Sequence, residues 1–219
     1  MPPRYSSEFV ACMERVLGVY TRPCNPDIPL ICMDEKPFQL RSDSRPALPM
    51  KSGQVRREDY EYERQGTCRL FLFTEPLAGW RRVQARKQRT KKDWALEIQT
   101  LLDDDYPNAS RVCLVMDNLN THTLGSLYEA FDPETAYALA RRLDICYTPK
   151  HGSWLNMAEV ELSALTLRCL DRRIGSLDEL HQAVSAWARQ RNHNEKTMNW
   201  QFTAKDARIR LKHLYPKFN

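Results

Sequence analysis

The sequence predicts an α/β fold in which helices flank a mixed sheet of five strands. Short apolar runs of the kind that form buried strands alternate along the chain with segments whose apolar residues recur every three or four positions. Strands separated by helices favour parallel pairing, whereas the first three predicted strands follow one another without a helix and can pair as a meander. The chain has 219 residues, which is enough to bury a core without disulfide support.

The N-terminal half is expected to contain a helix, three strands and a second helix, in that order. The helices are predicted at residues 7–17 and 90–102, and the strands at residues 30–34, 67–75 and 80–86. Ser6 or Ser7 is a suitable N-cap for the first helix, because a hydroxyl side chain can accept a hydrogen bond from a free backbone N–H. Residues 41–58 are polar, basic and proline-containing, which predicts a long exposed loop between the first two strands.

The C-terminal half is expected to alternate between strands and helices and to end in helices alone. Strands are predicted at residues 111–117 and 144–149, and helices at residues 124–131, 133–143, 156–170, 177–192 and 203–214. In the last helix Ile209, Leu211 and Leu214 are expected to pack, which leaves its basic residues on the solvated face.

Composition and cysteine usage are those of an ordinary globular protein in a reducing compartment. Apolar residues make up 42% and charged residues 28% of the chain, and its formal net charge is +5. The longest apolar runs are far too short to cross a bilayer, so we expect no membrane partner. The seven cysteines form an odd number without a CxxC pair, and four lie inside apolar runs. We therefore expect free, buried thiols and a cytoplasmic location.

One stretch of the chain, residues 81–92, concentrates positive charge without any acid. Its seven basic residues are Arg81, Arg82, Arg86, Lys87, Arg89, Lys91 and Lys92. Such a run is typical either of a solvated strand edge or helix face, or of a surface that contacts the phosphates of a nucleic acid. Charge alone leaves both interpretations open.

Two predicted strands end in an aspartate at equivalent places. LICMD ends at Asp34 and RVCLVMD ends at Asp117. In open α/β sheets ligands bind beyond the carboxyl ends of the strands, so neighbouring strands would bring these two carboxylates together. Carboxylates held this close repel one another, and a hard divalent cation with oxygen ligands relieves that repulsion. The alternative is that each aspartate only caps a following turn or helix.

A third acid is available on the helix that follows the last predicted strand. The core-facing stripe of this helix leaves Glu159 and Glu161 about 80° from its centre, on opposite flanks. Helical periodicity therefore does not choose between them. Glu159 also has a purely structural interpretation, because Asn156 as N-cap with Glu159 three residues later matches a capping box.

Several longer blocks of the sequence resemble a known family. They are CMDE (32–35), DYEYERQGT (59–67), EPLAGWR (75–81), LVMDNLNTH (114–122), YTPKHGSWLNMAEVELS (147–163) and WQFTAKDARIRLKHLYP (200–216). Together they look like the catalytic region of bacterial insertion-sequence transposases of the Tc/mariner-like superfamily, which are DDE enzymes. The resemblance implies a ribonuclease H-like fold, with residues 1–28 as N-terminal helix and linker, residues 29–175 as catalytic core and residues 176–219 as a helical extension of the same domain.

The resemblance also implies roles for individual residues. Asp34, Asp117 and Glu159 match the three acids of the family, which implies that they are catalytic and bind two Mg²⁺ ions, with Mn²⁺ as a substitute. The residues expected to support these acids or to contact DNA are Glu35, Asn118, His122, Lys150, His151 and Asn156. For His122 the expected role is a hydrogen bond to one of the acids, because such outer groups orient metal ligands.

The function implied by the resemblance is metal-dependent DNA cleavage and strand transfer at the ends of an insertion sequence. The expected partners are double-stranded DNA, at the element ends and at the target, and a second copy of the chain in a synaptic homodimer. A DNA substrate favours backbone contacts by residues 81–92 and a cytoplasmic, nucleoid-associated location.

Family members usually carry a helix-turn-helix module ahead of the catalytic region. Residues 1–28 leave no room for it, so we expect a separate helix-turn-helix protein or reading frame to recognise the element ends. Two alternatives to the transposase remain open at this point. One is a stand-alone metal-dependent nuclease, and the other is a DNA-binding transposase remnant without catalytic activity.

Overall fold

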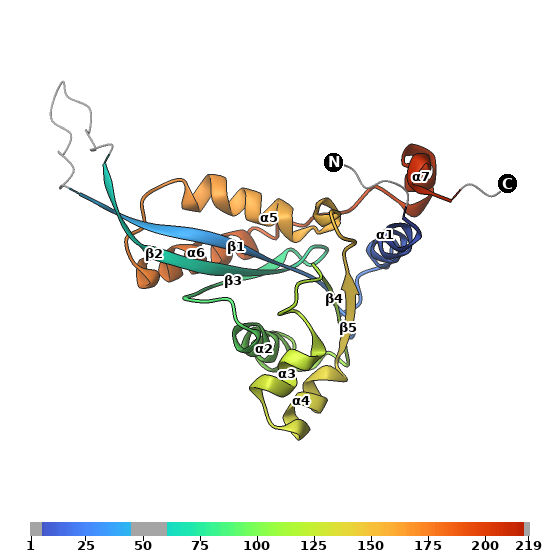
Figure 1. Cartoon of the computed structure of the whole chain (residues 1–219), viewed down its shortest axis with the longest axis horizontal. Helices are drawn as coiled ribbons and strands as arrows, with labels where there is room; N and C mark the ends of the chain where they lie inside the picture. Colours follow the sequence, from blue (N-terminus) through green and yellow to red (C-terminus); the bar gives the residue numbers. More distant parts are fainter. Residues whose placement is uncertain (1–5, 45–60, 217–219) are drawn as a thin grey trace.

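The computed structural model describes residues 6–44 and 61–216, and five strands within them form one mixed sheet (Figure 1). The strands are β1 (Leu30–Asp43), β2 (Tyr62–Glu75), β3 (Trp80–Arg86), β4 (Val112–Met116) and β5 (Leu143–Tyr147). Their order across the sheet is β3-β2-β1-β4-β5. β1, β2 and β3 pair antiparallel as a meander, and β4 and β5 extend the sheet from β1 in parallel. The predicted mixed sheet of five strands is therefore confirmed.

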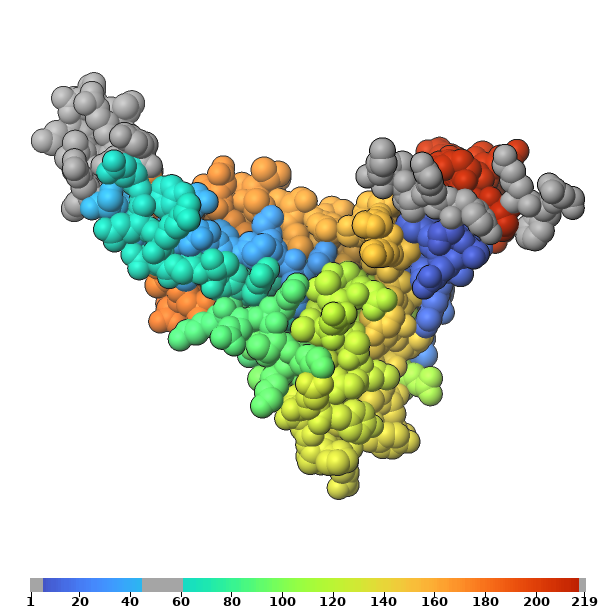
Figure 2. Space-filling model, viewed as in Figure 1, coloured from blue at the N-terminus to red at the C-terminus, as the bar shows by residue number. Residues whose placement is uncertain are grey.

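Helices cover both faces of this sheet (Figure 1). On one face lie α1 (Ser7–Tyr20), α5 (Ala158–Leu165), α6 (Leu177–His193) and α7 (Ala204–Arg210), and on the other lie α2 (Lys91–Thr100), α3 (Leu124–Ala130) and α4 (Pro133–Ala140). Short helical turns occupy Leu101–Asp105, Ser153–Leu155, Thr166–Leu170 and Lys212–Leu214. In the space-filling view the segment that contains α3 and α4 forms a lobe below the sheet (Figure 2). None of the helices in the described part of the chain is long and apolar enough to cross a membrane.

Alternation of side chains along the strands divides the core between the two faces of the sheet. Cys32, Leu72 and Val115 point toward the face covered by α1, α5, α6 and α7. Ile31 and Phe73 point toward the face covered by α2, α3 and α4. All five side chains are fully buried. The position of a residue along its strand therefore decides which of the two core layers its side chain enters.

The hairpin of β1 and β2 is longer than the two predicted strands. Its pairing continues outward to Asp43 opposite Tyr62. The first six residues of β2 are all exposed, so this part of the strand carries no apolar pattern in the sequence. The expected loop over residues 41–58 is wrong at its start, because residues 41–43 belong to β1 and pair with β2. Residues 45–58 lie outside the described residues.

Side-chain caps determine where α1 and α2 begin. The Ser6 hydroxyl accepts a hydrogen bond from the backbone N–H of Phe9 at 3.2 Å, so Ser6 is the N-cap of α1. Thr90 and Asp93 form a reciprocal capping box at the start of α2. Both caps satisfy backbone N–H groups that have no partner inside the helix.

The C-terminal helix packs differently from the prediction. A single helix over residues 203–214 is expected, but α7 ends at Arg210 and a separate turn follows it. Ala207 is the buried residue of α7, and Ile209, two positions further on, lies on the opposite side of the helix and is 68% exposed. The expected packing is therefore wrong for Ile209, whereas Leu214 is buried as predicted.

All seven cysteines of the chain are free thiols. The four that lie in apolar runs, Cys32, Cys68, Cys113 and Cys146, are buried. The prediction that these four cysteines lie in the core is therefore confirmed.

Candidate active site

The pairing of β1 with β4 brings two aspartates together at the carboxyl ends of these strands. Cys32 pairs with Val115 in parallel, and the same register two residues further on sets Asp34 beside Asp117. Asp34 is 8% exposed and accepts a hydrogen bond from the backbone N–H of Glu35 at 2.7 Å. Alternation along β1 turns the Asp34 carboxylate toward the layer that contains α1 and α5, on the same face as Cys32.

Glu159 approaches these aspartates from the first turn of α5. Burial raises the pKa of Asp34 to about 7, together with the negative charges of Glu159, Asp117 and Glu35, while the hydrogen bond from the Glu35 N–H acts in the opposite direction. Among the three carboxylates the charge of Glu159 has the largest influence. The three acids predicted from the sequence therefore share one electrostatic environment.

The turn before α5 is held against β1 and α1. The buried side chain of Asn156 donates a hydrogen bond to the carbonyl of Met33 at 2.8 Å, one residue before the first aspartate. The Tyr20 hydroxyl, at the end of α1, donates to the carbonyl of Leu155 at 2.7 Å and accepts from the N–H of Met157 at 3.3 Å. These contacts fix the start of α5 relative to the strand that carries the first aspartate.

The capping-box interpretation of Glu159 does not hold in the structure. Met157 is the N-cap of α5, and Asn156 lies one residue before it. The Oδ1 atom of Asn156 accepts from the N–H of Ala158 at 3.1 Å. The Glu159 side chain is exposed and forms no hydrogen bond or ion pair within residues 6–44 and 61–216. Its carboxylate is therefore available to a ligand.

The structure distinguishes Glu159 from Glu161 as the third acid, a choice that helical periodicity leaves open. Glu161 is fully buried, and its carboxylate is bound by Arg81 and Arg191. Glu159, on the other side of the helix, has no cationic partner among the described residues. Of the two glutamates, Glu159 is the one that adds charge near the aspartates.

A buried imidazole links the second aspartate to Glu35. His122 is fully buried, with Nδ1 at 2.9 Å from Oδ1 of Asp117 and Nε2 at 2.7 Å from Oε1 of Glu35. Burial lowers the pKa of His122, but the hydrogen bonds to Asp117 and Glu35 outweigh burial and raise it to about 9. The raised pKa favours the protonated imidazole, in which both ring nitrogens are donors to the two carboxylates.

Neighbouring side chains hold this imidazole in one orientation. Trp94 on α2 stacks on the ring of His122, with centroids 5.9 Å apart and planes 26° apart. The Tyr147 hydroxyl donates to the backbone carbonyl of His122 at 2.7 Å. Arg89 Nε lies 3.4 Å from the second carboxylate oxygen of Glu35. The carboxylate of Asp117 is thus oriented by a histidine that is itself packed and hydrogen-bonded.

A groove runs from Asp117 across the loop that follows β5. One hollow of about 470 Å³ is bounded by Asp117, Asn118, Lys150 and His151, and a second of about 420 Å³ continues from the same loop toward the first turns of α1. His151 has a φ of 65°, in the left-handed region that side chains rarely adopt. Lys150 and His151 are exposed, so they can contact an anionic ligand that lies beside the acids.

The chemistry of the donor atoms fits a hard divalent cation. Asp34, Asp117 and Glu159 supply carboxylate oxygens, which Mg²⁺ and Mn²⁺ prefer, and no thiolate lies among them. Within the described part of the chain, no three His, Cys, Asp or Glu side chains converge closely enough to hold an ion.

A comparison with known families establishes where this chain belongs. The family model for DDE superfamily endonucleases matches residues 29–181, a range that includes all three acids. The chain belongs to the DDE superfamily endonucleases. The resemblance noted from the sequence is confirmed at this level, and the bacterial insertion-sequence branch stays a prediction. No curated protein is significantly similar to this DDE endonuclease in sequence.

Solved structures of Mos1 share the fold of this DDE endonuclease. The Mos1 mariner paired-end complex with Mn is 13% identical, with a TM-score of 0.55 over 90% of this chain and 62% of that chain. The Mos1 strand transfer complex is 14% identical, with a TM-score of 0.57 over 86% of this chain and 57% of that chain. This likeness confirms the predicted ribonuclease H-like fold. The DDE endonuclease spans about 60% of the length of the Mos1 chains.

Three basic residues of the DDE endonuclease that lie on β3 face inward or bind acids. The Arg81 side chain is fully buried, which argues against its expected contact with a DNA backbone. Arg82 and Arg86 both bind the buried carboxylate of Glu97. Their charges are compensated within the protein, which argues against their expected role as primary phosphate contacts.

The remaining basic residues of this stretch lie at the surface. Two of them form ion pairs, Arg89 with Glu35 and Lys91 with Glu129. Lys87 and Lys92 are exposed and have no ion pair within the described residues. Of the seven, these two lysines are the ones whose charges are free for a phosphate.

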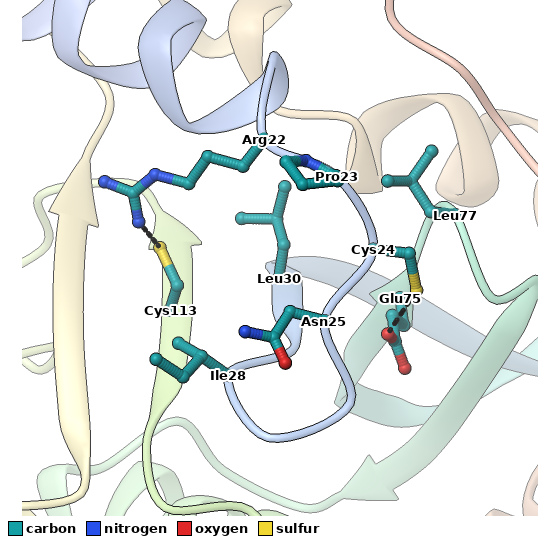
Figure 3. A pocket seen from close by; sticks show the side chains of 9 residues that line it. All are labelled: Arg22, Pro23, Cys24, Asn25, Ile28, Leu30, Glu75, Leu77 and Cys113. Atoms are coloured by element: carbon teal, nitrogen blue, oxygen red, sulfur yellow. Dashed lines mark hydrogen bonds between the residues drawn. The ribbon is translucent and has the colours of Figure 1, made fainter.

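A separate cavity of about 210 Å³ opens at the other ends of β1 and β4 (Figure 3). Cys24 and Glu75 line one side and Arg22 and Cys113 the other, with Leu30 between them. Leu30 and Cys113 pair with each other near the starts of their strands, four residues before the two aspartates. This cavity therefore lies apart from the carboxylates.

Two residues that support the site carry no motif in the sequence. Tyr20 continues the apolar spacing of α1, which indicates a buried residue but not the partners of its hydroxyl. Arg191 is one of several charged residues on α6, and no local pattern indicates that it binds Glu161. Both contacts join segments that are far apart in the chain.

Proposed function

We propose that this DDE endonuclease is the catalytic domain of a transposase, which cleaves DNA at the ends of an insertion sequence and joins the freed 3′ ends to target DNA. Membership of the DDE endonuclease family supports the cleavage step. The fold shared with Mos1 in paired-end and strand transfer complexes supports transposition as the setting. The observation that carries the proposal is the placement of Asp34 and Asp117 at the carboxyl ends of the neighbouring strands β1 and β4, with the charge of Glu159 on α5 acting on Asp34.

The proposed cofactor is a pair of Mg²⁺ ions held by Asp34, Asp117 and Glu159, for which Mn²⁺ would substitute. The all-oxygen donor set supports this choice, as do Mos1 complexes of the same fold with Mn and with Mg. When bound, two such ions activate the attacking oxygen of a phosphoryl transfer and stabilise the leaving oxygen.

The residues around the acids have supporting roles in this proposal. His122 orients the carboxylate of Asp117, and Asn156 ties the start of α5 to β1. Lys150 and His151 line the groove beside Asp117 and would contact backbone phosphates of the DNA strand that reaches the acids. Asn118, which lines the same groove, has a position suited to a polar contact with that strand.

The proposed reaction has two steps. Water attacks the phosphodiester at the element end and the bond to the 3′ oxygen breaks, which leaves a 3′-hydroxyl and a 5′-phosphate. This 3′-hydroxyl then loses its proton to solvent, attacks a phosphodiester of the target DNA and displaces the 3′ oxygen of the target strand. Neither step forms a covalent bond to the enzyme, so no serine or tyrosine nucleophile is required.

The proposed partners are double-stranded DNA, at the element ends and at the target, and a second copy of the chain. The paired-end complexes of Mos1 support this assembly, because that protein has the same fold. Recognition of the element ends by a helix-turn-helix module, which the resemblance to the family implies, is part of the proposal.

Nicking of a supercoiled plasmid in Mn²⁺ tests the cleavage step without a known end sequence. Wild-type protein is expected to nick the plasmid, and Asp34→Asn, Asp117→Asn and Glu159→Gln are expected to lose this activity. Joining of a labelled duplex with a free 3′-hydroxyl to the plasmid then tests strand transfer.

Three outcomes would overturn parts of the proposal. Nicking without joining would favour a stand-alone nuclease. Absence of both activities together with absence of Mn²⁺ binding would favour a non-catalytic remnant. A protein–DNA adduct trapped in a single turnover would contradict the two-step mechanism.

A further inference from the structure

The buried carboxylate of Glu161 is held by two arginines. Arg191 on α6 binds it with two parallel hydrogen bonds, from Nε to Oε2 at 2.9 Å and from Nη2 to Oε1 at 2.7 Å. Arg81 on β3 adds a third, from Nη2 to Oε1 at 3.3 Å. The side chains of Glu161 and Arg81 are fully buried. These contacts connect the first turn of α5 to α6 and to β3.

The position of Arg81 is itself fixed by the backbone around it. Its guanidinium donates to the carbonyls of Gly79, at 2.9 Å, and Lys196. Asn192 on α6 accepts from the N–H of Arg81 at 2.9 Å and donates to its carbonyl at 2.8 Å. Gly79 has a φ of +67°, and a Cβ there would lie 2.9 Å from the backbone of Glu195. The turn between β2 and β3 therefore packs directly on the loop that follows α6.

Glu159 and Glu161 lie on opposite sides of α5. Two residues along an α-helix correspond to a rotation of about 200°. Glu161 faces the two arginines, while the exposed Glu159 acts on Asp34. Rotation of α5 about its own axis would therefore move both carboxylates at once.

The contacts of Asn156 and Tyr20 hold the segment before α5, and none of them lies on the side of the helix that faces α6. α5 continues directly into the helical turn Thr166–Leu170, and directional hydrogen bonds restrain the rotation of a helix more sharply than apolar packing does. The contacts of Glu161 supply such a restraint on the side of α5 that faces α6.

We propose that Glu161, Arg81 and Arg191 form a clamp that sets the rotation of α5, so that Glu159 stays within reach of Asp34 and Asp117. The three are positioning residues, because they touch neither substrate nor cofactor. The inference rests on the proposed function, in which Glu159 is a metal ligand.

The composition of the clamp favours orientation over stability. A buried ion pair contributes little more stability than apolar side chains of the same volume. This one combines two arginines with a single carboxylate, and within the described residues Nε of Arg81 has no hydrogen-bond partner. The fork of a guanidinium, by contrast, fixes the direction of the carboxylate that it binds.

A second cluster of the same composition provides a matched control. Glu97 on α2 is 1% exposed and is bound by Arg82 and by Arg86, whose Nε lies at 2.6 Å. Like Glu161, it is a buried glutamate between two arginines. α2 carries none of the three acids, so Glu97→Gln removes an equivalent ion pair without releasing α5.

Mn²⁺ affinity, measured by electron paramagnetic resonance of the free ion, tests the clamp in the purified chain. Glu161→Gln is expected to weaken Mn²⁺ binding by at least about tenfold, as is typical of outer residues that orient metal ligands. Glu97→Gln is expected to change the affinity by less than about twofold, at a comparable loss of melting temperature.

The outcomes separate the clamp from the metal centre. Equal Mn²⁺ affinities for Glu161→Gln and Glu97→Gln would overturn the clamp and leave the metal centre intact. If wild-type protein does not bind Mn²⁺, this result contradicts the proposed function, and with it the clamp that rests on that function. Should Glu161→Gln not fold, Arg191→Lys keeps the charge but loses the two parallel hydrogen bonds. It is expected to weaken Mn²⁺ binding, and an unchanged affinity would equally overturn the clamp.

Discussion

Asp34 and Glu35 are consecutive residues of β1, and their carboxylates point to opposite faces of the sheet. Asp34 lies on the side of α5, where the charge of Glu159 acts on it. Glu35 lies on the side of α2 and binds His122, which in turn binds Asp117. One strand therefore provides an acid of the candidate site and, one residue later, an anchor for the group that orients the second acid.

Replacement of His122 by glutamine is expected to remove a pH-dependent part of the stability. Burial lowers the pKa of His122, but hydrogen bonds to Asp117 and Glu35 raise it to about 9, above the ordinary value of 6.5. The resulting stabilisation is complete below the unfolded pKa and is lost as the pH rises through the folded one. The difference in unfolding free energy between wild type and variant should shrink over this window, by up to about 3 kcal/mol.

Urea unfolding at both ends of this pH window measures the difference. His213→Gln, at an exposed position outside the cluster, serves as the control. A difference between wild type and His122→Gln that stays constant across the window would mean that His122 is not charged in the folded protein.

Asp34→Asn is expected to stabilise the metal-free protein above neutral pH. Burial and the charges of Glu159, Asp117 and Glu35 raise the pKa of Asp34 from 3.8 to about 7. The folded protein then keeps a proton that the unfolded chain releases, so the stability of wild type falls as the pH rises through this window, by up to about 4 kcal/mol. Asparagine does not titrate, so the two proteins should be alike at low pH and diverge above it.

Chemical unfolding in the presence of a chelator checks this divergence. Asp144→Asn is a suitable control, because Asp144 lies at the surface in an ion pair with Arg15. A variant at position 34 that is less stable than wild type above neutral pH would contradict the account of Asp34 as a buried, uncompensated acid.

Lys87→Ala and Lys92→Ala are expected to weaken binding to all duplex sequences alike. Both lysines are exposed, and neither has an ion pair within the described residues. Each lost phosphate contact should reduce the slope of log affinity against log salt concentration by about 1. Fluorescence anisotropy with a labelled duplex at several salt concentrations measures the slope.

Arg81→Ala is the control that distinguishes the loss of a phosphate contact from the loss of any positive charge. Arg81 is buried against Glu161, so its loss should leave the salt slope unchanged and lower the unfolding free energy by about 3 to 5 kcal/mol. A salt slope that falls for Arg81→Ala but not for the two lysine variants would reverse the assignment.

Asn156→Ala is expected to destabilise the fold by about 1 to 3 kcal/mol, because two buried backbone groups lose their partner. These groups are the carbonyl of Met33 and the N–H of Ala158. Asn199→Ala, at an exposed position, should stay within about 0.5 kcal/mol of wild type. Denaturant unfolding compares the two, and equal effects would mean that Asn156 does not anchor α5.

The order of elements and the two aspartates could be predicted from the sequence because buried strands carry continuous apolar runs. LICMD and RVCLVMD end at Asp34 and Asp117, and parallel pairing brings these ends together. The outer part of the β1–β2 hairpin could not be predicted in the same way. It is exposed along β2, so hydrophobic alternation is missing there.

The choice between Glu159 and Glu161 could not be made from helical periodicity. It depends on which flank of α5 faces β1 and which faces Arg191 on α6, and these segments are distant in sequence. The burial of Arg81 has a local signal, since Arg81, Val83 and Ala85 alternate with less buried residues along β3. A count of the basic residues over 81–92 does not register that alternation, because it treats all seven positions alike.

Titration of Mn²⁺ into wild-type protein beside Asp34→Asn, Asp117→Asn and Glu159→Gln tests the central claim most directly. Wild type should bind Mn²⁺ and gain about 2.7 kcal/mol of stability when the free ion is at 100 times its dissociation constant. Each of the three variants should lose this binding while remaining folded. Binding that survives in all three variants, or a wild type that binds no Mn²⁺ at millimolar concentration, would contradict the assignment of these acids as a metal centre.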